Sequence, residues 1–211
     1  MELESNLKNA YKQAYKMACE KIINMDPVKI SYNTNAYYDE DQKVFYIKYL
    51  NEDYVVDCMT GDVKKKFSQE EVTITVKVLI LHYLINANSK PLTGNLISFK
   101  EIKGGGTIYY QSFYKRAIDP LIKAFQDNPD KLLIAAEKLS GIRENYGSAS
   151  VTINIFPLVP VTYVIWQGDE EVPSSGTILF DDSVTSYLPN EDIVLAASYG
   201  TYQLMKLARD K

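Results

Sequence analysis

Residues 161–192 read VTYVIWQGDEEVPSSGTILFDDSVTSYLPNED and contain the clearest fold signal in the chain. Two apolar runs, Val161–Trp166 and Thr177–Phe180, have the length of strands and enclose a turn-like segment. Short apolar runs that are joined by a turn are typical of a β-hairpin. The following residues, Pro189–Asp192, place carboxylates where they would meet the positive end of a helix dipole. The stretch therefore predicts a C-terminal hairpin plus helix.

Carboxylates gather around this hairpin. Asp169, Glu170 and Glu171 occupy the turn, and Asp181 follows the second apolar run. Carboxylate oxygens are the ligands that Mg²⁺ and Ca²⁺ prefer, so these four residues are candidate metal ligands. The spacing of an EF-hand loop is absent, and a solvated or lysine-paired turn is the other interpretation. Both interpretations stay open.

The first sixty residues combine one helical pattern with several strand patterns. Leu3, Leu7 and later apolar residues recur at helical spacing, which predicts an amphipathic helix over residues 3–24 that ends at Asp26-Pro27. Short β-type runs with turn-like segments between them then favour an antiparallel meander. These runs are Lys29–Tyr32, Ala36–Tyr38, Val44–Leu50 and Tyr54–Cys58.

The middle of the chain is mainly helical. Ser68 and Glu71 have the spacing of a capping box and predict a helix over residues 69–87, which is apolar nearly all round and therefore belongs in the centre of the fold. Further helices and two strand-like runs follow. The helices are expected at Ser112–Ile118, 120–126 and 129–140, and the strand-like runs are Leu96–Phe99 and Ser150–Phe156.

These patterns predict an α+β fold with a largely antiparallel sheet, a central buried helix and the C-terminal hairpin plus helix. Strands do not alternate regularly with helices, which disfavours a doubly wound parallel sheet. The length of 211 residues fits a single domain over residues 1–211, with a helical insert at about 111–141.

Composition excludes several classes of protein. The net charge of −4 argues against nucleic-acid binding, and the basic run Lys64–Lys66 is interpreted as solvated surface. The longest apolar run, Val76–Ile85, is too short to span a bilayer. Cys19 and Cys58 are too few for a disulfide scaffold, and the N-terminus lacks the apolar core of a signal peptide. We therefore expect a cytoplasmic protein with reduced thiols and no membrane association.

Four residues are candidates for ligand binding. His82 is the only histidine, so a zinc site with two histidine ligands is excluded. His82 is either a hydrogen-bonded core residue or, if it faces a cavity, an axial ligand to a corrinoid or haem metal. Tyr109 and Tyr110 follow the glycine run 104–106, which is either a flexible turn or the gate of a pocket that these tyrosines line. Trp166 lies beside the acidic turn and is the fourth candidate.

An ordered set of motifs resembles the domain-of-unknown-function family 3786 over nearly the whole chain. The motifs are Leu81–Leu84, Pro91–Gly94, Ile97–Phe99, Phe156-Pro157, Pro160-Val161, Gly168–Glu171, Ile178–Asp181, Tyr187–Pro189 and Glu191-Asp192. The resemblance implies an origin in anaerobic bacteria or archaea, and it carries no established activity. Some relatives have a Cys-rich iron–sulfur module of the kind found in corrinoid proteins, which points to anaerobic redox or corrinoid metabolism. Two separated cysteines cannot ligate such a cluster, so no iron–sulfur cluster is expected here.

Two functions from different classes follow. The first is a non-catalytic small-ligand-binding or accessory protein that handles a corrinoid or another tetrapyrrole. The alternative is a metal-assisted hydrolase or transferase that uses Asp169–Glu171 and Asp181. A protein partner with a basic surface that meets the acidic turn is a third possibility.

Overall fold

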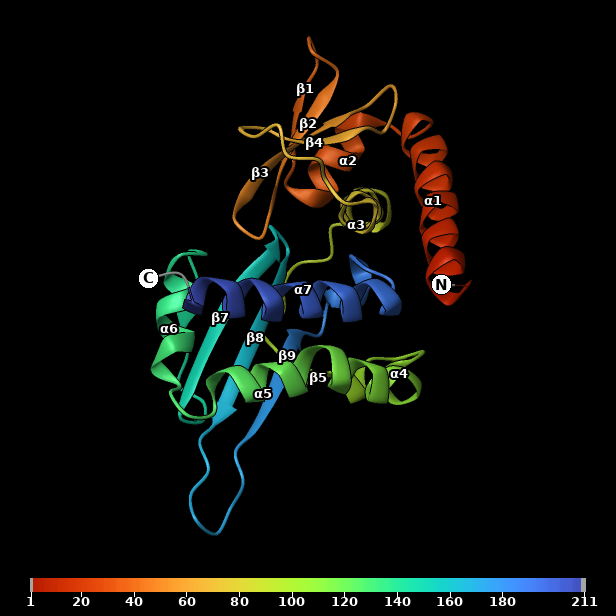
Figure 1. Ribbon diagram of the computed structural model, residues 1–211. Helices are drawn as coiled ribbons and strands as arrows, with labels where there is room; N and C mark the ends of the chain where they lie inside the picture. Colours follow the sequence, from red (N-terminus) through yellow and green to blue (C-terminus); the bar gives the residue numbers. More distant parts are fainter. Residues whose placement is uncertain (1, 210–211) are drawn as a thin grey trace. The chain divides into compact units, whose positions relative to one another are not determined.

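The computed structural model describes residues 2–209, with side chains from Lys8 onward, and it separates into two compact units (Figure 1). The first unit runs to Lys90 and includes Phe156–Leu158 and Ser186–Leu188. The second unit contains Pro91–Ile155, Val159–Thr185 and the residues from Pro189 onward. The side chains of Leu3 and Leu7, on which the first helix prediction partly rests, lie outside the described residues.

The first unit combines helices with a four-stranded antiparallel sheet in the order β1-β2-β3-β4. The helices are α1 (Glu2–Ile23), α2 (Pro27–Thr34) and α3 (Ile74–Asn86). The strands are β1 (Tyr37–Asp39), β2 (Val44–Tyr49), β3 (Glu52–Asp57) and β4 (Val63–Lys65).

The core of the first unit forms because α3 is apolar on nearly every side. Most of its side chains from Val78 onward are buried. Tyr83 stacks on Phe156 with ring centroids 4.3 Å apart, and its hydroxyl donates a hydrogen bond of 2.8 Å to the carbonyl of Thr34. A buried tyrosine needs such a partner for its hydroxyl, and this bond ties α3 to the end of α2.

The second unit contains a five-stranded sheet in the order β5-β9-β8-β7-β6, with helices over one face (Figure 1). Tyr163 of the sheet donates a hydrogen bond of 3.0 Å to the carbonyl of Ala197, which anchors the last helix on that face. The strands are β5 (Leu96–Ser98), β6 (Ile142–Arg143), β7 (Ala149–Phe156), β8 (Val159–Trp166) and β9 (Ser175–Asp181). The helices are α4 (Gly106–Phe113), a π-helical turn (Tyr114–Ile118), α5 (Asp119–Phe125), α6 (Asp130–Glu137) and α7 (Asn190–Arg209), and short 3₁₀ turns occur at Phe99–Glu101 and Val184–Ser186.

The predicted α+β class with antiparallel pairing, a buried helix and a C-terminal hairpin plus helix is confirmed. The strands divide between two sheets. The single domain with a helical insert stays a prediction, because the division into two units does not test it.

The predicted strand at Lys29–Tyr32 is wrong, because these residues belong to helix α2. The side chain of Asp26 accepts a hydrogen bond of 2.9 Å from the backbone N–H of Val28 and caps this helix, with Pro27 in its first turn. Aspartate before proline is favoured at a helix start as well as at a helix stop, so the same dipeptide ends α1 and begins α2.

The capping box predicted at Ser68 and Glu71 is also wrong. The Ser68 hydroxyl accepts a hydrogen bond from the backbone N–H of Glu70, at 3.1 Å, and α3 begins only at Ile74. Residues 66–73 therefore connect β4 to α3 as a loop. A capping box forms instead at Ser98, whose N–H and hydroxyl both donate to Glu101.

Helix length and polarity also bear on membrane association. The strongly apolar helix α3 has 13 residues, whereas the longer α1 and α7 carry polar faces. Within residues 2–209, no helix combines the length and the apolar character needed to cross a bilayer.

Candidate functional site

The four predicted ligand-binding residues lie on three elements. His82 is partly exposed on α3 in the first unit, and its carbonyl accepts a hydrogen bond of 2.8 Å from the Asn86 side chain. Tyr109 and Tyr110 are neighbours on α4 in the second unit. Trp166 ends β8, and 43% of its surface is exposed. The structure therefore brings Tyr109 and Tyr110 together by sequence adjacency, and it places His82 in the other unit.

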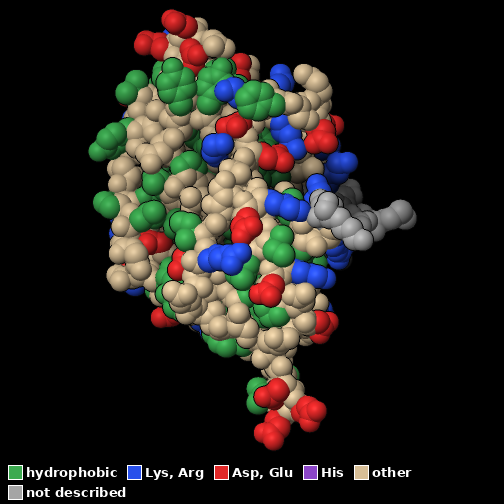
Figure 2. Space-filling view, turned by 90° about the vertical axis from the view of Figure 1, so that its left-hand side faces the viewer, with side chains coloured by type: hydrophobic (Ala, Val, Ile, Leu, Met, Phe, Trp, Pro, Cys, Tyr) green, Lys and Arg blue, Asp and Glu red, His purple; other side chains and the backbone are tan. Residues whose placement is uncertain are grey.

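The predicted metal ligands lie at the two ends of strand β9. Asp169 is in the loop before β9, where its carboxylate accepts hydrogen bonds of 2.9 and 2.8 Å from the backbone N–H groups of Glu171 and Val172. These bonds lower the pKa of Asp169 and close a turn. Figure 2 shows acidic side chains on this protruding loop. Asp181 is the last residue of β9, so the strand separates it from the turn.

The carboxylate of Asp181 has its own partners. It is only 3% exposed and accepts hydrogen bonds from Thr93, Gly94 and Ser183. In the part of the chain with described side chains, no group of three or more His, Cys, Asp or Glu side chains is arranged to hold a metal ion. The structure therefore does not bring Asp181 together with the acidic turn.

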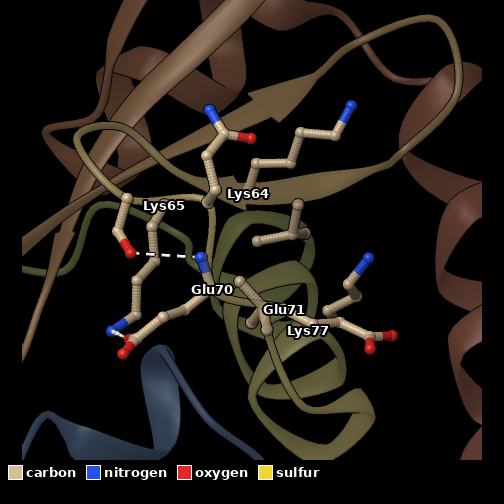
Figure 3. Close-up of a pocket in the computed structure, with 9 residues that line it drawn as sticks. Lys64, Lys65, Glu70, Glu71 and Lys77 are labelled. Atoms are coloured by element: carbon tan, nitrogen blue, oxygen red, sulfur yellow. Dashed lines mark hydrogen bonds and ion pairs between the residues drawn. The ribbon is translucent and has the colours of Figure 1, made fainter.

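A pocket of about 250 Å³ lies in the first unit between β4, the 66–73 loop and the first turn of α3 (Figure 3). It forms because the loop leaves β4 and passes the N-terminal end of α3 before the chain enters the helix. Val63 and Val72 give it apolar surface, and charged or polar side chains supply the rest. These are Lys64, Lys65, Ser68, Gln69, Glu70, Glu71 and Lys77.

Asp62 holds two of the pocket lysines. Lys77 donates a hydrogen bond of 2.8 Å to one carboxylate oxygen, and the Lys64 nitrogen lies 3.1 Å from the other. Burial alone raises the pKa of Asp62, but the hydrogen bonds from the two lysines outweigh burial and lower the pKa. The carboxylate therefore stays ionised at neutral pH, and it fixes both ammonium groups beside the pocket.

Lys65 is held by a second pair of acids. Its ammonium nitrogen lies 2.9 Å from the carboxylates of both Glu52 and Glu70. These two hydrogen bonds raise the pKa of Lys65, so the side chain stays charged. Figure 3 shows Lys65 and Glu70 on one side of the pocket, with Lys77 and Glu71 on the other.

A second pocket, of about 260 Å³, shares Lys65 and Ser68 with the first. Its other lining residues come from the β2–β3 turn, the start of β3 and the loop, and they are Asn51, Glu52, Asp53 and Phe67. The segment from Lys65 to Ser68 thus separates two small polar cavities. We refer to the two cavities together as the lysine pockets.

The chemistry of the lysine pockets suits binding better than proton transfer. A general acid or base works best with a pKa near the operating pH. Here the ion pairs move the pKa of Asp62 down and that of Lys65 up, away from neutrality in both cases. Charged groups that are fixed in this way can recognise a polar ligand without exchanging protons with it.

Sequence reasoning missed the lysine pockets because it treated Lys64–Lys66 as solvated surface and placed Glu70 inside a helix. One signal in the sequence could have indicated the pockets. Neighbouring residues of a strand point to opposite faces, so Lys64 and Lys65 cannot both lie on the same face of β4. Asp62 and Glu70 lie close to these lysines in the sequence, whereas Glu52 reaches Lys65 because β3 pairs with β4.

Comparisons with known proteins show the family to which the chain belongs. Neither the curated proteins nor the solved structures compared with the chain include a match. A family model described as a domain of unknown function matches residues 26–202, a range that covers elements of both units. The resemblance expected from the motifs is therefore confirmed, and the chain belongs to the family described as Domain of unknown function (DUF3786).

Proposed function

We propose that the protein is a non-catalytic small-ligand-binding or accessory protein, and that its ligand is a small polar molecule that binds in the lysine pockets. One observation carries the proposal: two partly buried lysines, Lys65 and Lys77, are held by ion pairs with acids beside a cavity of about 250 Å³. Lys65 and Lys77 are only 22% and 20% exposed, so their ammonium groups are partly desolvated. Partly desolvated charges interact with a ligand more strongly than fully exposed ones.

The distribution of charge favours a ligand with groups of both signs. A lysine ammonium has three N–H donors, so Lys77 can keep its bond to Asp62 and still bind an anionic group. Glu71 lies on the same side of the pocket and makes no ion pair with any residue whose side chain is described. Its carboxylate can therefore bind a cationic group of the ligand.

The alternative of a metal-assisted hydrolase or transferase has less support. It requires Asp169–Glu171 and Asp181 to act on one metal ion, and β9 separates these residues. The carboxylates of Asp169 and Asp181 also already accept hydrogen bonds from neighbouring backbone groups. We therefore favour the binding function.

The binding proposal is tested by calorimetry with three probes: glutamate as a zwitterion, inorganic phosphate as an anion and putrescine as a dication. We expect glutamate to bind most tightly and to raise the melting temperature, because a ligand that binds only the folded state stabilises it. Lys77→Met should weaken glutamate binding about tenfold or more, the factor that about 1.4 kcal/mol produces.

Lys123→Met is the matched control. Lys123 also forms an ion pair with an acid, Asp119, but it lies on α5 in the second unit. The control should bind glutamate as the wild type does. Absence of binding by all three probes, or equal binding by the wild type and Lys77→Met, would refute the proposal.

The biological setting is a further part of the proposal. We assign the protein to anaerobic redox or corrinoid-linked metabolism in the cytoplasm, where the free thiols of Cys19 and Cys58 would stay reduced. A corrinoid or another tetrapyrrole is then a second candidate ligand, with His82 as its axial ligand. His82 supports this assignment because its side chain is partly accessible on α3.

Titration with hydroxocobalamin and with haemin tests this second ligand. Axial coordination by His82 should shift the absorption bands of the cofactor, and His82→Ala should abolish the shift. Unchanged spectra, or a shift that persists in the variant, would remove the tetrapyrrole from the proposal and leave the test of the lysine pockets unaffected.

A further inference from the structure

The outer face of the first unit's sheet carries an exposed row of side chains. Cross-strand pairing aligns Tyr37 of β1 with Tyr46 of β2, and then with Val55 and Lys64 of the next two strands. Their sequence neighbours Phe45, Val56 and Val63 point to the opposite face and are completely buried. Side chains alternate along a strand, so the row that begins with Tyr37 faces away from this core.

Aromatic rings cluster on this outer face. Tyr37 stacks on Tyr46 with centroids 6.0 Å apart, and the ammonium of Lys66 lies 4.4 Å from the centre of the Tyr46 ring and 5.2 Å from that of Phe67. Tyr37 is 66% exposed and Phe67 is 80% exposed. We call Tyr37, Tyr46 and Phe67 the aromatic belt.

Charge is divided between the two sides of the aromatic belt. On one side, the turn between β1 and β2 carries Glu40 and Asp41, which form the acidic end. On the other side, Lys48 lies on the outer face of β2 and Lys66 follows β4, and these two residues form the basic end. The acidic end precedes Val44, the first residue of β2, and Lys48 lies four residues farther along the same strand. At the rise of a strand, Val44 and Lys48 are roughly 14 Å apart, which separates the acidic end from Lys48.

The two acids of the acidic end and the two lysines of the basic end differ in their internal contacts, because Lys66 lies over the rings of Tyr46 and Phe67. Glu40, Asp41 and Lys66 make no ion pair with other residues whose side chains are described, and Lys48 pairs only with Asp53, at 3.4 Å. Charges of opposite sign on the two sides of the aromatic belt make the face complementary to itself. A twofold rotation about an axis through the belt would place the acidic end of one copy opposite the basic end of the other.

We propose that this face binds a second copy of the chain in a twofold-symmetric dimer. The two aromatic belts pack against each other at the centre, where tyrosines often dominate binding energy. The acidic and basic ends meet at the rim, where charge complementarity fixes the orientation. The net charge of −4 disfavours a polyanion such as RNA as the occupant of this face. The dimer face shares Phe67 with the second lysine pocket, but dimerisation requires no ligand in either pocket.

Sedimentation equilibrium with charge-reversed variants tests the dimer. One variant carries Glu40→Lys and Asp41→Lys, and the other carries Lys48→Glu and Lys66→Glu. Each variant alone should be monomeric, because both ends of its face then have the same sign. A mixture of the two should form a heterodimer, since a basic face meets an acidic one.

The matched control reverses Glu170 and Glu171 to lysine, two acids of the exposed loop in the second unit, and it should dimerise like the wild type. Circular dichroism shows whether each variant is folded. A further variant, Tyr37→Ser, keeps the charges and removes an aromatic ring of the belt, so it should weaken the dimer. A wild type that is monomeric at about 100 µM overturns the proposal. So do single-end variants that still dimerise, or a mixture that stays monomeric.

Discussion

The backbone N–H of Gly94 donates a hydrogen bond of 2.7 Å to the carboxylate of Asp181, which ties the segment before β5 to the end of β9. Thr93 donates to the same carboxylate through its backbone N–H, at 3.0 Å. Ser183 adds its hydroxyl at 2.6 Å and its N–H at 3.0 Å. Because Asp181 is almost completely buried, these bonds replace the water that it would otherwise bind.

We expect Asp181→Asn to destabilise the protein by about 2–3 kcal/mol, because an amide removes the charge and directs N–H donors at other donors. Urea unfolding measures the change. Asp169→Asn is the control: it also removes an aspartate that accepts backbone hydrogen bonds in the second unit, but Asp169 is exposed, so its loss should be smaller. Equal losses in the two variants would contradict the role assigned to burial.

Asp181 also predicts how stability depends on pH. Burial alone raises the pKa of this carboxyl, but the hydrogen bonds from Ser183, Thr93 and Gly94 lower it below the ordinary value near 3.8. The folded state then binds its proton less readily than the unfolded state. The stabilisation is therefore fully present above the unfolded pKa of about 3.9 and is lost as the pH falls through the lower, folded pKa.

Urea midpoints of wild type and Asp181→Asn between about pH 7 and about pH 2 check this prediction. The difference between the two proteins should be constant above about pH 5 and should shrink below about pH 4, where Asp181 of the unfolded wild type binds a proton before that of the folded protein does. A difference that persists unchanged at the lowest pH would mean that the carboxylate charge does not contribute.

The role of Asp181 also shows where sequence reasoning fails. The residue was a candidate metal ligand because it follows an apolar run near other acids. Its actual donors include Thr93, which precedes it by 88 residues, and only the pairing of β5 with β9 brings the two together. The sequence contains each residue but not the register that makes them partners.

Elements with strong local patterns were predictable. Val151, Ile153 and Ile155 alternate along the sequence and are buried on β7, and α3 is buried as its apolar composition predicts. Strand β4 was missed because Val63 is its single apolar residue, and its pairing with Val56 across the sheet outweighs a weak local preference. The lysine pockets were missed because they are lined by β4 and by the loop that follows it, and the sequence predicted neither of these.

Gly61 offers a test of close packing in the first unit. Its φ of +73° lies in the left-handed region, and a Cβ at this position would lie 2.8 Å from the sulfur and 2.9 Å from the Cα of Cys19. Gly94 has a similar φ of +75°, but a Cβ there would meet open space. Both glycines therefore adopt a left-handed backbone conformation, but only Gly61 lacks space for a side chain.

We expect Gly94→Ala to cost about 1–2 kcal/mol, the penalty for a residue with a side chain in left-handed conformation. Gly61→Ala should cost more, because α1 must also move away from the new methyl group. Urea unfolding of both variants gives the comparison. Similar losses of stability in the two variants would show that α1 can move away from Gly61 at little cost. That result would contradict the tight packing of Cys19 of α1 against the turn at Gly61.

The thiol of Cys58 provides a chemical test of the structure near the end of β3. Burial, together with the carboxylate of Asp57, raises the pKa of this thiol to about 11. The thiolate is the reactive form, so at about pH 8 roughly 0.1% of Cys58 would be reactive, against about 10% for a thiol of pKa 9. Alkylation of the folded protein should therefore be about 100-fold slower than alkylation of the same cysteine in urea.

Iodoacetamide labelling, with Cys58 identified by peptide mass spectrometry, measures both rates. The dependence on pH separates the raised pKa from simple steric protection. With a raised pKa, the logarithm of the native rate should keep rising linearly up to about pH 9.5, whereas a shielded thiol of ordinary pKa would level off near 9. A native rate that levels off there, or that equals the rate in urea, would contradict the half-buried position of Cys58 beside Asp57.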